Sequence, residues 1–430
     1  MDLGLASSER AFSVDASSAD SHAGVGGSAS PVPPARIPVV APAPEPFAGS
    51  DAHRRFRERI GVLVSGYVLP NLPRWEREET LPREFFRTCG RAGMLGLMAP
   101  PEHGGTGLGY SYAVAQVEEL MRHRAASPAV SLMVQSNTLC PALATFGSDE
   151  VKREVLAPLA GGEAIGSLGA TEPTGGSALP QTVRCTAERE GAEWVVTGEK
   201  MYITNAPIAD WVLLLARTSA GAGPFTMSLI AVPTDLPGFE VVAQHRKMGL
   251  GASPTGHIRL DRVRVPARFL VGRAGHGYPH AAHVLCHERL LIAIGSLAYA
   301  RSLVDDAAER LRGTGDAGRP ARLAVARMRA RLEAARAFAY AAAVDVCAGV
   351  TDAGTTSMAK FALCELAQRV AAECARLHGP AAAWSDGGME AALREVRVLS
   401  VFAGTSETMR ELYGSRLATL MKRATLDAED

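Results

Sequence analysis

The chain has 430 residues, of which 47% are hydrophobic and 21% charged, and its 45 basic residues balance its 45 acidic ones. Zero net charge is atypical of proteins that bind nucleic acid or acidic membranes over a broad surface, so both classes are disfavoured. Seven scattered cysteines form no CxxC pair, which argues against a disulfide framework and favours a reducing cytoplasm. No apolar run predicts a membrane span, and the start lacks a secretory-signal pattern.

Residues 1–50 differ from the rest of the chain. They are rich in Ala, Ser, Gly and Pro and contain no Lys, and seven prolines lie between positions 31 and 46. Because proline prevents a regular helix, we expect a disordered extension here. Residues 51–162 instead carry apolar residues at helical spacing, with Ser111 and Ser148 as expected helix caps. This range predicts an N-terminal helical domain.

The remaining chain divides into two further regions. Residues 163–275 hold short runs rich in Val, Ile, Thr and aromatics, separated by Gly, Pro and Asn, which predicts a β-barrel-like domain of several strands. Residues 276–430 contain four long Ala- and Leu-rich periodic segments, typical of a four-helix bundle. Helices, then strands, then helices predict an α+β multidomain fold with segregated domains.

Two segments of the β region combine hydroxyls with small or aromatic residues. The loop 169–177, GATEPTGGS, exposes backbone N–H groups and hydroxyls that suit a flat polar ring or a phosphate, although a plain Gly-rich connection fits as well. In strand alternation Tyr202 and Thr204 point to the same face. They would then stack on and bond an aromatic ligand, or simply pack in the fold.

Two segments of the last region stand out: an acidic residue on an apolar helix stripe, and a glycine-containing junction between helices. Glu288 lies on an apolar stripe with Val284, Leu291 and Ile292, so we expect it to be buried. Burial would raise its pKa and make it a proton donor or acceptor near neutrality, whereas the alternative is a structural pair with the neighbouring Arg. The segment VFAGTSE, 401–407, predicts a helix junction broken by glycine and capped by Thr or Ser.

The three histidines at the start of the same helical segment do not predict a metal site. His280, His283 and His287 share a face only if the helix is regular from its start, where spacing is least reliable. We therefore interpret them as ordinary helix-face residues, and no metal is expected.

Seven motifs occur in a fixed order along the chain. They are GMLGLMAPPEHGGTGLGY (93–110), ATEPTGGS (170–177), GEKMYITNA (198–206), KMGLGASPT (247–255), HERLLIA (287–293), SMAKFALCE (357–365) and FAGTSE (402–407). Each motif is weak alone, but the ordered set resembles the acyl-CoA dehydrogenase flavoprotein family from about residue 52 to the C-terminus.

The resemblance implies FAD held between the β domain and the C-terminal bundle, usually in a homotetramer. The residues it places at the cofactor are Leu168, Ala170, Thr171, Gly176, Ser177, Tyr202, Thr204, Thr405 and Glu407. It places Ser177, His287 and Arg289 beside the substrate. The family reaction removes the proton α to a thioester carbonyl and passes the β hydride to the flavin.

The resemblance also locates the catalytic base. Most members carry a carboxylate just before the GT of the last motif, where this chain has Ala403, which accepts no proton. The isovaleryl and long-chain subgroups place the base before the helix Arg instead, and Glu288 stands at that position. The resemblance therefore implies Glu288 as base, in agreement with its expected burial.

Three departures from the family pattern bear on the substrate and the cofactor. Ala178 replaces the Asp of a GSD motif, the RxxFGxPxxxFQ segment is missing, and RLHGPAAAW, 376–384, replaces QxxGGxGY. The last two segments reach the neighbouring subunit's FAD in the family. We interpret the chain as a specialised member, from secondary metabolism, acting on acyl-CoA or on an acyl group carried by an acyl carrier protein.

The expected partners are an electron-transfer flavoprotein or another acceptor, and further copies of the chain in a homodimer or homotetramer. Two alternative functions remain open at this point. One is a flavin-dependent monooxygenase or oxidase on the same scaffold, and the other is a binding protein that has lost FAD.

Overall fold

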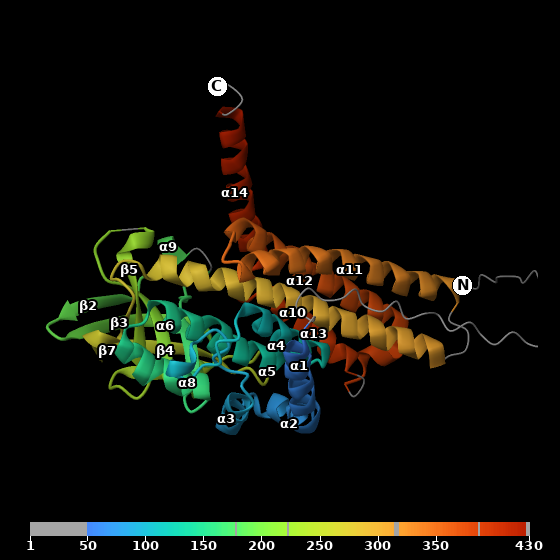
Figure 1. Ribbon diagram of the computed structural model, residues 1–430, viewed down its shortest axis with the longest axis horizontal. Helices are drawn as coiled ribbons and strands as arrows, with labels where there is room; N and C mark the ends of the chain where they lie inside the picture. Colours follow the sequence, from blue (N-terminus) through green and yellow to red (C-terminus); the bar gives the residue numbers. More distant parts are fainter. Residues whose placement is uncertain (1–49, 177–178, 222, 314–317, 386–387, 427–430) are drawn as a thin grey trace, which may run out of the picture. The chain divides into compact units, whose positions relative to one another are not determined.

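A computed structural model describes residues 50–176, 179–221, 223–313, 318–385 and 388–426 (Figure 1). The expected N-terminal extension and Ser177 lie outside the described residues. Along the described chain a helical region is followed by a sheet and then by a second helical region. The predicted α+β order is therefore confirmed.

In the first helical region, α-helices are joined at several points by wider π-helical turns that continue the chain without a break. The side chain of Ser148 caps a helix by accepting from the N–H of Val151 at 3.3 Å, as predicted. Ser111 lies inside its helix, which begins at Tyr110. The helices are α1 (Asp51–Leu63), α2 (Leu69–Glu78), α3 (Arg83–Arg91), α4 (Tyr110–Arg122), α5 (Ala126–Met133), α6 (Cys140–Phe146), α7 (Asp149–Val151) and α8 (Ala157–Gly161), and the π-helical turns are η1 (Val64–Val68), η3 (Val134–Leu139) and η4 (Lys152–Leu156).

The strands form one sheet in the order β6-β7-β3-β2-β4-β5-β8, and β1 pairs in parallel with β4. The apolar strands β4 and β5 are buried along almost their whole length, which explains their uninterrupted runs of Leu, Ile and Val. The strands are β1 (Gly166–Gly169), β2 (Thr186–Glu190), β3 (Glu193–Thr204), β4 (Trp211–Arg217), β5 (Met227–Pro233), β6 (Phe239–Gln244), β7 (Thr255–Pro266) and β8 (Leu270–Val271), with the short helix α9 (Leu179–Thr182) between β1 and β2.

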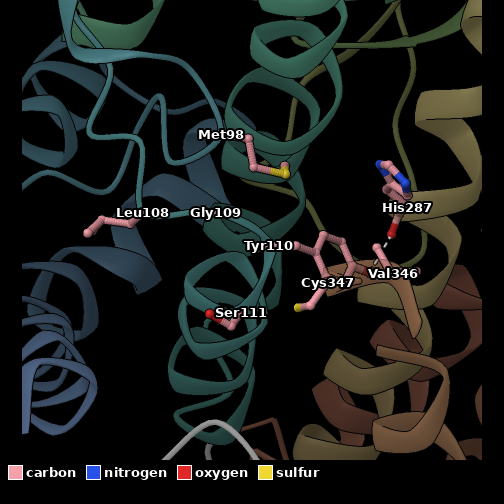
Figure 2. Close-up of a pocket in the computed structure, with 8 residues that line it drawn as sticks. All are labelled: Met98, Leu108, Gly109, Tyr110, Ser111, His287, Val346 and Cys347. Carbon is pink, nitrogen blue, oxygen red and sulfur yellow. Dashed lines mark hydrogen bonds between the residues drawn. The ribbon is translucent and has the colours of Figure 1, made fainter. Parts of the chain in front are cut away.

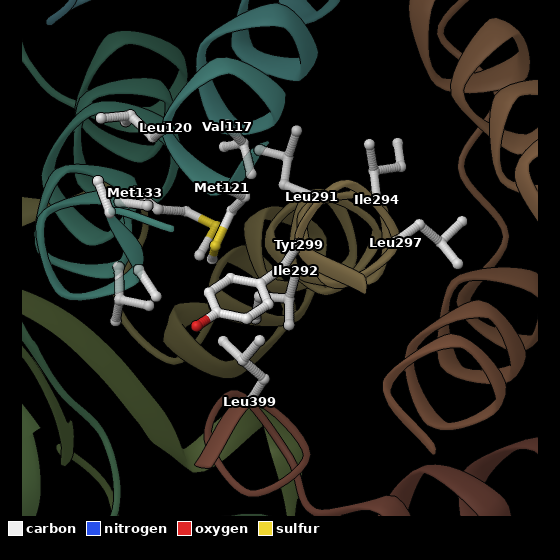
Figure 3. Packing of buried hydrophobic residues seen from close by; sticks show 14 of the residues in the cluster. Val117, Leu120, Met121, Met133, Leu291, Ile292, Ile294, Leu297, Tyr299 and Leu399 are labelled. Atoms are coloured by element: carbon white, nitrogen blue, oxygen red, sulfur yellow. The ribbon is translucent and has the colours of Figure 1, made fainter. Parts of the chain in front are cut away.

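The second helical region contains the four predicted long helices and one shorter helix, α13, that the periodicity did not predict. Helix α10 is long and apolar enough to cross a membrane, but 72% of its most apolar window is buried inside the protein. It packs against α4 in the core, where Leu291 and Ile292 lie close to Val117 and Met121 (Figure 3). The helices are α10 (Gly277–Gly313), α11 (Arg319–Cys347), α12 (Ala353–His378), α13 (Met389–Leu399) and α14 (Ser406–Leu426).

Candidate active site

Glu288 lies near the start of α10, on the side of the helix that faces the core. It is 4% exposed, and Leu290–Ile294, which follow it, are at most 1% exposed. Burial raises the pKa of the Glu288 carboxyl from 4.5 to about 7, because an ionised carboxylate loses its hydration there. A hydrogen bond with Thr138 and the charges of Arg289 and Lys360 act in the opposite direction. The expected burial is confirmed, and this group can exchange a proton near neutrality.

Two cations from different helices hold the turn between α13 and α14. The Nε of Arg289, on α10, donates to the carbonyl oxygen of Ala403 at 3.2 Å, and the Nζ of Lys360, on α12, donates to that of Gly404 at 2.8 Å. Ala403 has φ 54°, a left-handed conformation that costs a non-glycine residue about 1–2 kcal/mol. Such a conformation persists where surrounding contacts fix it, and these two bonds supply that restraint.

The same turn begins the last helix. The Oγ1 of Thr405 accepts from the backbone N–H of Thr408 at 3.2 Å, so the predicted cap is confirmed. Glu407, in the first turn, is exposed, and its own backbone N–H and the Thr405 side chain lower the pKa of its carboxyl by hydrogen bonding. The Oγ of Ser406 is buried and has no hydrogen-bond partner among the described residues.

On the sheet, a buried ion pair anchors the loop that follows β1. The Nζ of Lys200 donates to Oε1 of Glu172 at 2.8 Å and to the carbonyl oxygen of Ala170 at 3.2 Å. The backbone N–H groups of Arg184 and Cys185 donate to the same carboxylate at 2.7 and 2.9 Å. The carboxylate of Glu172 therefore ties the loop predicted to face the cofactor to Lys200 on β3 and to the backbone that follows α9.

The strand β3 presents an aromatic ring and a hydroxyl beside this loop. Its pairing with β7 shifts between Lys200 and Ile203, and Tyr202, inside this bulge, has φ 62° and a 64% exposed side chain. The N–H of Met201 donates to the carbonyl oxygen of Thr171 at 2.9 Å, so the loop lies along the strand. Thr171 and Thr204 are both half-buried. The exposed Tyr202 ring lies 5.2 Å from the ring of His245 and is suited to stacking on a flat aromatic group such as the expected flavin.

The other residues expected at the cofactor lie along the same loop. Leu168 is the third residue of β1 and is half-buried, Ala170 follows the strand and is buried, and Gly176 is exposed. Ser177, the next residue, lies outside the described residues.

Asn205 connects this part of the sheet with the helical segment beside Glu288. Its Nδ2 donates to the carbonyl oxygens of Ser131, on α5, at 3.0 Å and of Gly166, on β1, at 3.2 Å. Helix α5 continues directly into η3, which carries Thr138. The structure thus ties the sheet residues and the carboxyl of Glu288 to one helical segment. Sequence reasoning missed both Asn205 and Thr138.

His287, the residue before the proposed base, lines a pocket of ≈ 370 Å³ together with residues of α4 and α11 (Figure 2). Its Nε2 lies 3.0 Å from Oγ1 of Thr351, and its backbone oxygen accepts from the hydroxyl of Tyr110 at 3.0 Å. Burial, and then the charge of His283, lower the pKa of His287 to about 4, so the ring is neutral at neutral pH. The described residues hold no cluster of three His, Cys, Asp or Glu side chains suited to a metal ion.

A second buried carboxyl with a raised pKa lies elsewhere in the core. Burial raises the pKa of Glu395, on α13, to about 8, and the charge of Glu76 adds to this effect. Its Oε2 accepts a hydrogen bond from the hydroxyl of Tyr299. Because none of the residues expected at the site contacts it, a raised pKa alone does not identify the base. Glu288 is distinguished from Glu395 by the turn at Ala403 and by the cations Arg289 and Lys360 that hold this turn.

Three family models match the chain in succession. They are the N-terminal domain of acyl-CoA dehydrogenases over residues 50–163, the middle domain over 167–263 and the C-terminal domain over 275–418. The mitochondrial long-chain specific acyl-CoA dehydrogenase of Sus scrofa is 30% identical over 377 residues, which cover 84% of this chain and 86% of that protein.

Solved structures of acyl-CoA dehydrogenases share the fold. An acyl-CoA dehydrogenase from Geobacillus kaustophilus matches with a TM-score of 0.82 at 28% identity, over 86% of this chain and 98% of that one. A glutaryl-CoA dehydrogenase from Mycobacterium smegmatis in complex with FADH2 matches with a TM-score of 0.79 at 27% identity, over 86% and 95%. The relatives named here differ in their acyl group, so they do not assign a substrate subgroup. The chain belongs to the acyl-CoA dehydrogenase family of FAD-dependent oxidoreductases, which act on CH–CH bonds.

Proposed function

We propose that the protein desaturates an acyl thioester between its α and β carbons, with FAD as oxidant and Glu288 as the base that removes the α proton. One observation carries the assignment of the base. The Glu288 carboxyl is buried with a pKa of about 7, beside the turn in which Ala403 takes the place of the usual family carboxylate. A base with a pKa near the working pH transfers protons most effectively.

The residues around the base support this role. Burial keeps bulk water from the carboxylate, and hydrogen bonding by Thr138 lowers its pKa, which favours the ionised form. Arg289 directs its guanidinium to the carbonyl oxygen of Ala403 rather than to Glu288, so the carboxylate keeps an oxygen available for a proton. Among the described residues, Glu288 takes part in no ion pair within 4.0 Å. A structural carboxylate is normally held by such a pair, whereas Glu288 can take up a proton without breaking one.

The residues proposed to hold FAD lie on the sheet and at the start of α14. Tyr202 would stack on the ring system, and the hydroxyls of Thr171 and Thr204 would bond its polar edge. Thr405 and Glu407 would contact it from the helical side. Leu168, Ala170, Gly176 and Ser177 complete the proposed set. When bound, FAD supplies the oxidant that takes up the β hydride.

The substrate is proposed to be an acyl group on CoA or on an acyl carrier protein, with Ser177, His287 and Arg289 on its side of the site. The position of Glu288 favours the isovaleryl and long-chain subgroup. We further propose an electron-transfer flavoprotein or another acceptor as redox partner, a homodimer or homotetramer, and a cytoplasmic location. Each of these follows from the family resemblance and the absence of paired cysteines in the sequence.

The test is an anaerobic titration of the purified flavoprotein with a panel of acyl thioesters. The flavin absorbance should be bleached by at least one thioester. Glu288→Gln should keep the flavin but bleach about 10²–10⁴ times more slowly, the usual contribution of a general base. Glu395→Gln is the matched control, because it removes another buried carboxyl of raised pKa, and it should bleach normally.

Bleaching of Glu288→Gln at the wild-type rate would refute Glu288 as base. Bleaching of neither protein by any thioester, together with oxygen consumption when reduced flavin is supplied, would instead support a monooxygenase or oxidase.

A further inference from the structure

His245 lies against the bulge of β3 that carries Tyr202. It directly follows β6, and its backbone N–H donates to the carbonyl oxygen of Thr255, at the start of β7, at 2.8 Å. The ring centres of His245 and Tyr202 lie 5.2 Å apart with an angle of 39° between the planes, and Nε2 of His245 lies 3.0 Å from Sδ of Met201. One half-buried imidazole, anchored by the sheet, therefore contacts both residues of the bulge.

Tyr202 needs such contacts, because neither its backbone nor its burial fixes its ring. Its φ of 62° is a left-handed conformation that residues with a side chain rarely adopt and that persists only where the surroundings fix it. Tyr202 is also 64% exposed, so core packing does not select its rotamer. Aromatic pairs attract each other when their ring centres lie about 4.5–7 Å apart, as these two do. Among the described residues, no other aromatic ring packs against Tyr202.

The same bulge holds the loop that is expected to face the cofactor. The N–H of Met201 donates to the carbonyl oxygen of Thr171 at 2.9 Å, so the loop is attached to the residue whose sulfur His245 contacts. Burial lowers the pKa of His245, and the charges of His257 and Lys247 lower it further. The imidazole is therefore uncharged at neutral pH, with one N–H donor and one acceptor nitrogen.

We propose that His245 is a positioning residue for the aromatic cofactor: its imidazole holds the Tyr202 ring in the orientation that receives the flavin, so that it acts through Tyr202 rather than on the ligand. The inference rests on the proposed function for the identity of the ligand, whereas the contact between the two rings belongs to the protein itself.

The first test follows the Tyr202 ring by ¹⁹F NMR of the full-length protein labelled with fluorotyrosine, with and without added FAD. The chain has eight tyrosines, and the signal that disappears in Tyr202→Phe identifies this one. His245→Ala removes the imidazole, so the Tyr202 signal should move toward that of a tyrosine free in solvent. His245→Phe keeps a ring at this place and loses only the nitrogens, so the signal should stay closer to its wild-type position.

The matched control is His257→Ala. His257 is a histidine of the same sheet, on β7, but its Nε2 lies 3.0 Å from a carboxylate oxygen of Glu199. Its removal should leave the Tyr202 signal in place. An unmoved Tyr202 signal in His245→Ala, or an equal movement in His257→Ala, would overturn the proposal and leave His245 a structural residue of the connection between β6 and β7.

A double-mutant cycle on FAD binding then shows whether His245 acts through Tyr202. The dissociation constant of FAD is measured for the wild type, His245→Ala, Tyr202→Ala and the double variant. His245→Ala should weaken FAD binding by about 2- to 10-fold, the usual contribution of an aromatic pair. The same substitution should have little further effect once Tyr202 is alanine, because the two residues act as a unit. Equal factors in the two backgrounds would refute the inference.

The two experiments separate this inference from the proposed function. A wild-type protein that takes up no FAD would refute the proposed function, while the ¹⁹F signal would still decide whether His245 orders the Tyr202 ring. A Tyr202→Ala variant that binds FAD as tightly as the wild type would refute the proposed place of the flavin, and with it the role of His245 toward the cofactor.

Discussion

The protein contains two buried glutamate–lysine sets, and their hydrogen bonding differs. In the sheet, Glu172 accepts from the Lys200 ammonium and from two backbone N–H groups, all within 2.9 Å. In the helical region, Glu288 has one side-chain hydrogen bond and takes part in no ion pair within 4.0 Å among the described residues, and the nearby ammonium of Lys360 bonds a backbone carbonyl instead.

The difference shows how one pair of residue types serves two purposes. A buried carboxylate with a complete set of donors is held as an anion and fixes the chain around it. A buried carboxylate with an incomplete set sits near the point where it exchanges its proton. The first arrangement anchors the loop that follows β1, and the second gives α10 a group able to do chemistry.

The largest expected effect is a loss of stability on removing the charge of Glu172, the carboxylate with the complete set of donors. Glu172→Gln leaves the ammonium of Lys200 buried without its counter-charge, and we expect a loss of about 3–5 kcal/mol in the free energy of unfolding, measured with urea. Glu199→Gln is the control, because that carboxylate is partly exposed and pairs with Arg259 and His257 near the surface, so its loss should cost about 1 kcal/mol or less. An equal loss of unfolding free energy in the two variants would contradict the expected difference between the buried Glu172 pair and the surface Glu199 pair.

The next effect concerns the incomplete set and the pH dependence of the proposed reaction. Because burial raises the pKa of Glu288 to about 7, the protonated form predominates below that pH and accepts no proton. The rate of anaerobic flavin bleaching should therefore rise with pH and level off above about 7, falling about tenfold per unit on the acid side. Stopped-flow absorbance measures it, and a rate that is flat through neutrality would count against Glu288.

A smaller shift should follow from removing the one side-chain bond to the carboxylate. Thr138→Val removes a hydrogen bond that favours the ionised form, so the acid limb of the same profile should move up by about one unit. Ser136→Ala, in the same π-helical turn, is the control, because that hydroxyl bonds the backbone oxygen of Met94 and not Glu288. Identical profiles for the two variants would contradict the role of Thr138.

The smallest expected effect is a gain. Ala403 holds a left-handed φ of 54°, which glycine adopts without strain, so Ala403→Gly should raise the free energy of unfolding by about 1 kcal/mol or less. Ala348→Gly, at a helix end with φ −82°, has no such strain to relieve and should be neutral or slightly destabilising. A melting temperature lowered by Ala403→Gly would indicate that the methyl group contributes packing that outweighs the strain.

Features that depend on the pattern of neighbouring residues were predicted from the sequence. The apolar stripe through Val284, Leu291 and Ile292 was enough to predict that Glu288 is buried, and the order of elements followed from composition and periodicity. The turn at Gly404 and the cap by Thr405 were also predicted correctly, because both are properties of a few adjacent residues.

Residues that act through distant contacts were not predicted. Lys360 reaches a carbonyl 44 residues away, and Asn205 bonds a backbone oxygen 74 residues away. Only the fold brings such partners together, so no spacing rule identifies them. Lys360 did leave a signal, a charge within the otherwise apolar Ala359–Leu363, of the same kind that marked Glu288. Helix α13 was missed as well, since it is short and amphipathic between two turns.

The burial of lysine has a further consequence for the surface of the protein. Of the five lysines, Lys200 and Lys360 are fully buried, and Lys247 holds its ammonium against a backbone oxygen. The other 40 basic residues are arginines, whose guanidinium groups stay protonated and are poor nucleophiles. A protein proposed to handle activated acyl groups therefore presents few amines to them, and stray acylation of its own surface finds few sites.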